Sequence, residues 1–122
     1  MNIALWIASG ALALFVAAAG FVKAFRPIAE TRKMPWTNGK SDNTIRLIGF
    51  SEILGALGLI LPTATGIAPI LTPIAALCLA VLMGGATVTH VRIKDPNSAA
   101  ITTAVLMAIA LFIAVGRFAG LA

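Results

Sequence analysis

The chain has 122 residues, of which 60% are hydrophobic and 11% are charged, and its formal net charge is +5. Its mean hydropathy is +1.02. About a quarter of the residues in soluble domains are charged, and a small soluble fold keeps much of its surface wet. The composition therefore predicts a single membrane-embedded domain over residues 1–122. It speaks against nucleic-acid binding, because the basic residues lie at the ends of apolar runs and form no basic face with interleaved aromatic residues.

Four apolar runs follow one another along the chain. Each is close to the roughly 20 residues that a helix needs to cross the hydrocarbon core of a bilayer. Strands of a membrane barrel would be shorter and would alternate in polarity. We therefore predict an all-α, four-helix transmembrane bundle with spans at about 3–25, 44–61, 68–91 and 99–118. No basic residue precedes the first run, so we interpret it as a retained span and not as a signal peptide.

The ends of the first two spans have physical causes. Pro27 cannot continue a helix, so the first span is expected to end just before it. Asp42 or Asn43 can cap the second helix, because a short side chain can accept a hydrogen bond from a free backbone N–H. Pro62 and Gly66 are expected to close that helix.

The remaining boundaries are less definite. Pro69 and Pro73 both suit the first turn of a helix, so the third span could begin anywhere between residues 68 and 73. The stretch 95–98 reads as a turn, and Asn97 or Ser98 is the expected cap of the fourth helix.

The link at about 27–42 is the longest polar segment. Residues 28–34 could form one or two helical turns lying on the membrane, with Trp36 at the depth of the headgroups and Trp6 at the opposite interface. The alternative is a solvated connector.

Positive charge is distributed unevenly between the two ends of the predicted bundle. The link between the second and third spans carries no charge, and Arg117 is the basic residue at that end. The positive-inside rule therefore puts the first and third links in the cytoplasm and both termini on the non-cytoplasmic side. We expect a multi-pass protein of the bacterial cytoplasmic membrane. The residues behind this orientation are Lys23, Arg26, Arg32, Lys33, Lys40, Arg46, Arg92 and Lys94.

Glu52 is the unusual residue, because it lies near the middle of an apolar run. An ionisable group there is costly unless it is neutral or paired. It should lie about 9 Å deeper than Arg46 at the rise of an α-helix, and the two do not share a helical face. Lys23 and His90, near the same ends of the first and third spans, are better placed as partners.

Each of these residues also has a structural interpretation. Lys23 and Arg46 could extend to the headgroups, His90 could be an interfacial polar residue, and Glu52 could serve as polar glue between helices. Small residues on the same faces, Gly20 beside Lys23 among them, would let the helices approach closely.

Metal and thiol chemistry have little support in the sequence. Cys78 is the only cysteine, which excludes an intramolecular disulfide and a cysteine-based metal site. One Glu and one His could supply two ligands, but the Glu-x-x-His spacing of di-metal bundles is missing, so no metal site is predicted.

Several short motifs give the chain a family resemblance. Gly20-Phe21-Val22-Lys23 closes the first span, and residues 46–56 read RLIGFSEILGA. Leu61-Pro62 precedes an uncharged turn, and Gly84-Gly85-Ala86 leads to His90 and Arg92. With these motifs the chain resembles the DoxX-like family of small four-span membrane proteins over nearly its whole length.

The resemblance implies a four-helix membrane bundle and the polar set Lys23, Arg46, Glu52 and His90. It also implies a link to redox chemistry, since the name-giving members are small subunits of a thiosulfate:quinone oxidoreductase. More distant relatives are linked to the assembly of other membrane proteins.

Three functions follow as hypotheses. The first is binding of a lipophilic small molecule, such as a quinone, by Lys23, Arg46, Glu52 and His90, in a membrane subunit of a redox complex. The second is a scaffold or assembly partner for other membrane proteins. The third is an enzyme in which Glu52 and His90 act as acid and base, and ion transport is a weaker fourth.

The expected partners are membrane lipids, the lipophilic molecule and a redox or other membrane protein. A homo-oligomer would help to bury the polar groups. No cofactor other than a quinone is implied.

Overall fold

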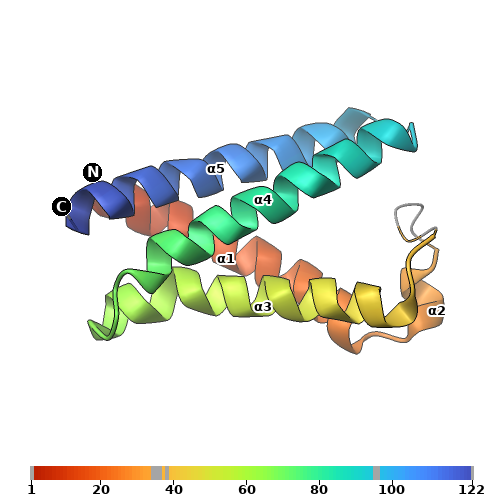
Figure 1. Ribbon diagram of the computed structural model, residues 1–122, viewed down its shortest axis with the longest axis horizontal. Helices are drawn as coiled ribbons and strands as arrows, with labels where there is room; N and C mark the ends of the chain where they lie inside the picture. The colour runs from red at the N-terminus through yellow and green to blue at the C-terminus, as the bar shows by residue number, and fades with distance from the viewer. Residues whose placement is uncertain (1, 34–36, 38, 95–96, 122) are drawn as a thin grey trace.

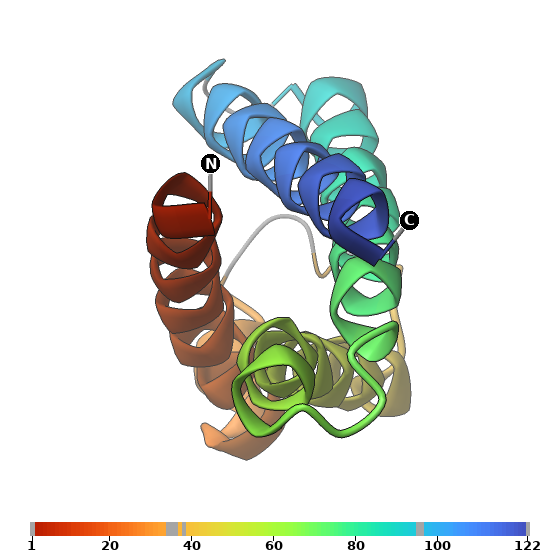
Figure 2. The same cartoon turned by 90° about the vertical axis from the view of Figure 1, so that its left-hand side faces the viewer.

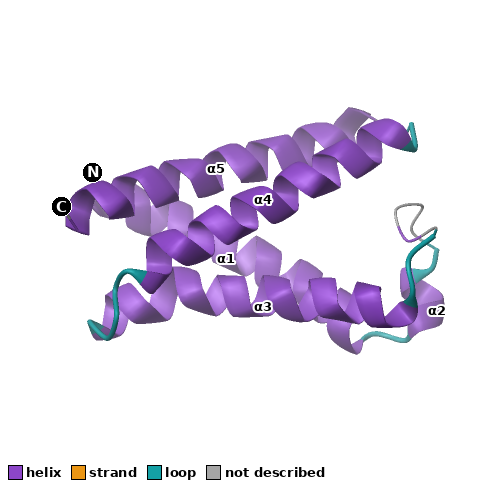
Figure 3. Ribbon diagram, in the orientation of Figure 1, coloured by secondary structure: helices purple, strands orange, loops and turns teal. Residues whose placement is uncertain are grey.

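The computed structural model describes residues 2–33, 37, 39–94 and 97–121, and within them it contains helices and connections but no strand (Figures 1 and 3). Four long helices each have the length and apolarity needed to cross a membrane. They are α1 (Asn2–Phe25), α3 (Asp42–Thr65), α4 (Leu71–Arg92) and α5 (Asn97–Leu121), and a single turn, α2 (Ile28–Thr31), follows α1. The predicted all-α bundle with four spans is confirmed.

The start of α3 differs from the prediction. Its N-cap is Ser41, and not Asp42 or Asn43, because the Ser41 hydroxyl accepts a hydrogen bond from the Thr44 backbone N–H at 3.1 Å. Asp42 instead occupies the first turn, where a negative charge is favourable at the positive end of the helix dipole.

The end of α3 also differs. The prediction that Pro62 closes this helix was wrong, since Pro62 is buried inside α3 and the helix continues to Thr65. In a bilayer no water competes for the backbone groups next to a proline. They keep their remaining helical hydrogen bonds or find partners within the protein, so a membrane helix tolerates a proline. The helix ends where expected at Gly66, whose φ of 73° lies in the left-handed region that glycine adopts at low cost.

The third predicted boundary is resolved. Helix α4 begins at Leu71, so Pro73 lies in its first turn and Pro69 lies in the preceding link. Helix α5 begins at Asn97, and the two side chains proposed as its cap, Asn97 and Ser98, lie outside the part of the chain whose side chains are described. The interfacial turn expected over 28–34 is helical at Ile28–Thr31, and Trp36 also lies outside the described residues.

The link into α3 is held by one arginine. Arg32 forms an ion pair with Asp42 at 2.7 Å and donates a hydrogen bond to the backbone carbonyl of Thr37 at 2.8 Å. These contacts fix the path of the chain on either side of Lys40.

The helices pack as two pairs, α1 with α3 and α4 with α5, and the pairs cross each other (Figure 1). They meet closely near the chain termini, where a Cβ on Gly116 would lie 2.5 Å from Leu5 Cδ2 and one on Gly55 would lie 2.7 Å from Leu79 Cδ2. Arg117 stacks over Trp6 at the same end, 5.0 Å from the ring centroid. From there the pairs diverge toward the end that carries α2 (Figures 1 and 2).

Both termini lie at one end of the bundle, opposite α2 and the α4–α5 link (Figure 1). That arrangement agrees with four spans. The orientation of this end away from the cytoplasm stays a prediction, which labelling of a cysteine at Ile67 with a membrane-impermeant reagent would test.

The buried core occupies the part of the bundle where the pairs are close. It contains Leu12 and Val16 of α1, Leu59 of α3, Leu79 of α4 and Ile113 of α5. Many other large apolar side chains lie on the outer faces, as expected for helices whose outer solvent is lipid.

Candidate functional site

The site begins with a close contact between the backbones of α1 and α3. A Cβ on Gly20 would lie 2.7 Å from the Gly49 carbonyl oxygen, and a Cβ on Gly49 would lie 2.6 Å from the Ala24 nitrogen. Only glycine permits this approach without displacement of a helix. Lys23 and Glu52 each follow one of these glycines by three residues, so both lie on the faces that the contact brings together.

The contact joins a base and an acid. Lys23 Nζ donates a hydrogen bond to Glu52 Oε1 at 2.5 Å, and the two side chains form an ion pair. The side chain of Glu52 is 1% exposed and that of Lys23 is 19% exposed. An unpaired carboxylate at such a position would be strongly disfavoured, so the pair lets α3 carry an acid inside the bundle.

The second carboxylate oxygen of Glu52 does not take part in this ion pair. Oε2 is buried and has no hydrogen-bond partner among the described residues. A buried acceptor without a donor costs free energy that the rest of the fold must offset.

Arg46 lies apart from the acid. Its Nη1 donates hydrogen bonds to the backbone carbonyls of Lys23, at 3.1 Å, and Arg26, at 2.8 Å. The last carbonyls of a helix have no partner within the helix, so Arg46 satisfies the carboxyl end of α1 from the first turns of α3. It does not contribute to the cavity described next.

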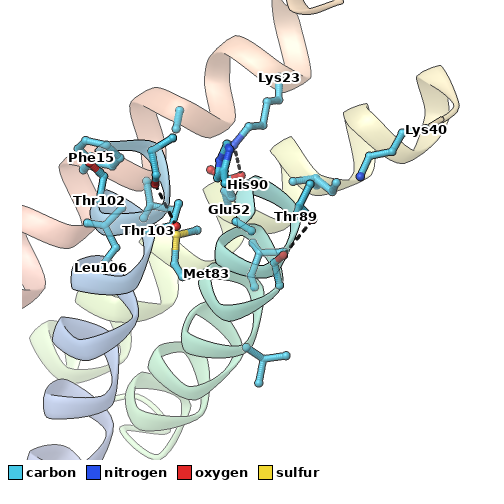
Figure 4. A pocket seen from close by; sticks show the side chains of 18 residues that line it. Phe15, Lys23, Lys40, Glu52, Met83, Thr89, His90, Thr102, Thr103 and Leu106 are labelled. Carbon is cyan, nitrogen blue, oxygen red and sulfur yellow. Dashed lines mark hydrogen bonds and ion pairs between the residues drawn. The ribbon is translucent and has the colours of Figure 1, made fainter. Parts of the chain in front are cut away.

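A cavity of about 620 Å³ lies between the two helix pairs in their diverging half. Its wall is mostly apolar, with Phe15 and Val16 from α1, Met83 from α4 and Leu106 from α5. Figure 4 shows Phe15, Met83 and Leu106 around the same space as Glu52. The cavity therefore combines a mostly apolar wall with one buried acid, Glu52.

The polar part of the wall lies toward the end that carries α2. Lys23, Glu52 and His90 all line the cavity, so the structure brings together three of the four residues predicted as a polar set (Figure 4). His90 comes from the last turn of α4, across the cavity from α1 and α3.

Sequence reasoning missed two contributions. Lys40, from the link before α3, lines the cavity at its polar end. Thr102 and Thr103 of α5 also line it, and Thr103 forms a hydrogen bond with Thr87 of α4 at 2.7 Å. Their small size was visible in the sequence, but their cavity-facing position depends on how the pairs cross.

No group of three or more His, Cys, Asp or Glu side chains comes together among the described residues in a way that could hold a metal ion. The polar wall contains ammonium, carboxylate and imidazole groups, which can form hydrogen bonds and charge pairs.

Comparison with known proteins gives the class of the chain. The sequence profile of the DoxX-like family matches residues 7–113, and the chain belongs to this family. No curated protein and no solved structure matches it. The family and the four apolar helices together define a small integral, multi-pass membrane protein.

Proposed function

We propose that this protein binds a lipophilic small molecule with a polar head, such as a quinone or its reduced form, in the cavity between the two helix pairs. The volume of about 620 Å³ falls in the range typical of small-molecule sites. Such sites are mainly apolar with a few placed polar groups, and Lys23, Glu52 and His90 match that description.

The observation that carries the proposal is that Glu52 lines the cavity and its buried Oε2 has no hydrogen-bond partner among the described residues. A purely structural ion pair would be expected to satisfy both carboxylate oxygens from the protein, since each buried acceptor left alone is costly. A ligand in the cavity would supply a hydrogen-bond donor to Glu52 Oε2, and its apolar part would contact the apolar side chains of the cavity wall.

The test is a binding measurement on the full chain in lipid nanodiscs, with a tritiated short-chain benzoquinone and its quinol as probes. In Ala86→Leu a larger side chain extends from a position in the cavity wall. We expect it to weaken saturable binding at least about tenfold, because the larger side chain occupies part of the space that the ligand fills.

Ala11→Leu is the matched control, because Ala11 is exposed on the outer face of α1. It should bind the probes as the wild type does. Probe uptake that fails to saturate, or that Ala86→Leu leaves unchanged, would show that the molecules dissolve only in the surrounding lipid and would contradict the proposal.

A further inference from the structure

We infer that the ligand presents a hydrogen-bond donor, such as a hydroxyl group on an apolar ring, to Glu52 Oε2. This inference rests on the proposed function and specifies the chemistry of the head. It predicts that the site prefers the hydroxyl form of a ligand over the matching carbonyl form.

The charge of Glu52 follows from its contact with Lys23. The ammonium group of Lys23 donates to Oε1 at 2.5 Å, so the acid accepts as the negative partner of an ion pair. An ionised carboxylate has acceptor sites only and cannot donate.

Oε2 of Glu52 has no hydrogen-bond partner among the described residues, and the side chain is 1% exposed. A carbonyl oxygen of a ligand near Oε2 would place two acceptors together without a proton between them. A hydroxyl group there would instead form a charge-assisted hydrogen bond, which is about twice as strong as a neutral one.

Other polar groups line the same cavity. Lys40 of the α2–α3 link and His90 of α4 line the polar part of the same cavity (Figure 4). An ammonium group is a donor only, and a neutral imidazole can donate from one ring nitrogen. A second oxygen on the ligand therefore lies among groups of types that can donate a hydrogen bond. A ring that carries a hydroxyl group toward Glu52 and a second oxygen toward Lys40 and His90 matches this lining.

The experiment compares three probes that share one ring and tail: decylubiquinol, decylubiquinone and the dimethyl ether of decylubiquinol. Affinities are measured for the full chain in nanodiscs under anaerobic conditions. We expect the quinol to bind at least about tenfold tighter than the quinone or the ether, because only the quinol can donate to a buried charged acceptor.

Glu52→Gln changes the acceptor itself. An amide can both donate and accept, so the quinol and the quinone should bind this variant within about twofold of each other. Ser51→Ala changes a polar side chain on the exposed face of α3, next to Glu52 in sequence but outside the cavity wall, and should keep the wild-type preference. The comparison between quinol and ether needs only the wild type, so it decides the question even if Glu52→Gln fails to fold.

The outcomes separate the two proposals. Equal binding of all three probes, or tighter binding of the quinone, would overturn the donor-head inference while leaving a lipophilic-ligand site in place. Saturable binding of none of the three would overturn the proposed function and this inference with it.

Discussion

At the scale of single residues, the two members of the ion pair are not equivalent. Glu52 is buried, whereas Lys23 retains 19% exposure at the end of α1. A lysine near a helix end can extend its long side chain toward the headgroups, but a glutamate one turn further into the bundle cannot reach them. Loss of Lys23 therefore leaves the buried charge of Glu52 without a partner. Loss of Glu52 leaves the ammonium group of Lys23, which is partly exposed and can be hydrated.

This asymmetry predicts unequal costs of substitution. Lys23→Met should lower the free energy of unfolding by about 3–5 kcal/mol, the usual cost of removing one partner of a buried pair. Glu52→Gln should cost clearly less, and the double variant should recover part of the loss caused by Lys23→Met. The free energies are measured by titrating dodecylmaltoside micelles with SDS. Equal losses in the two single variants would show that Glu52 is not held as a buried charge.

The sequence predicted part of this site. Glu52 was evident because an acid in an apolar run is costly wherever it lies, and the helical rise placed Lys23 and His90 at a similar depth. The role of Arg46 was not evident, because a basic residue near the start of a span can bind carbonyls, lipid or ligand equally well. Lys40 could not be assigned either, since a link residue reaches a cavity only through the path that Arg32 gives the chain.

At the scale of elements, the geometry of the site depends on how closely α1 and α3 approach. The contact of Gly20 with Gly49 brings the backbones near enough for Lys23 to reach Glu52. Between helices in lipid, such close packing replaces the hydrophobic driving force that water would supply. The glycines thus position the ion pair as well as join the helices.

Gly49→Ala tests this element directly. The added methyl group would lie 2.6 Å from the Ala24 nitrogen and 2.8 Å from the Gly20 carbonyl oxygen, so the helices must move apart. We expect a loss of about 1–3 kcal/mol in the same SDS titration, as for other overpacked contacts.

Gly10→Ala is the matched control on α1, because no other group lies within 4 Å of the place that its added methyl group would occupy. Alanine is the better helix former, so this change should be neutral or stabilising by up to about 1 kcal/mol. If the two variants behaved alike, the close approach of α1 and α3 would not be what holds the pair together.

Helix boundaries show what sequence reasoning can and cannot predict at this scale. Pro27 and Gly66 marked real ends, because one cannot continue a helix and the other adopts a left-handed conformation. Pro62 was misleading, because the rule that proline ends helices applies best where water can satisfy the broken backbone bonds.

At the scale of the whole molecule, the two helix pairs pack tightly at one end and diverge at the other (Figure 1). Hydropathy predicted the four spans but not this crossing of the pairs. Side chains that face lipid and side chains that line an apolar cavity are both apolar, so hydropathy does not distinguish them. Val81 illustrates the ambiguity, since it is 71% exposed and also lines the cavity. The cavity follows from the arrangement of small and large residues on all four helices together.

The central claim is that a lipophilic molecule occupies the space between the pairs. The most direct measurement is photolabelling in nanodiscs with a decylubiquinol analogue that carries a diazirine on its tail, followed by mass spectrometry of the peptides. We predict labels on the cavity wall from both pairs, at buried residues such as Val16 and Leu106, that excess decylubiquinol suppresses. Labels confined to outer residues such as Leu14 and Leu54, and unaffected by the competitor, would contradict the account.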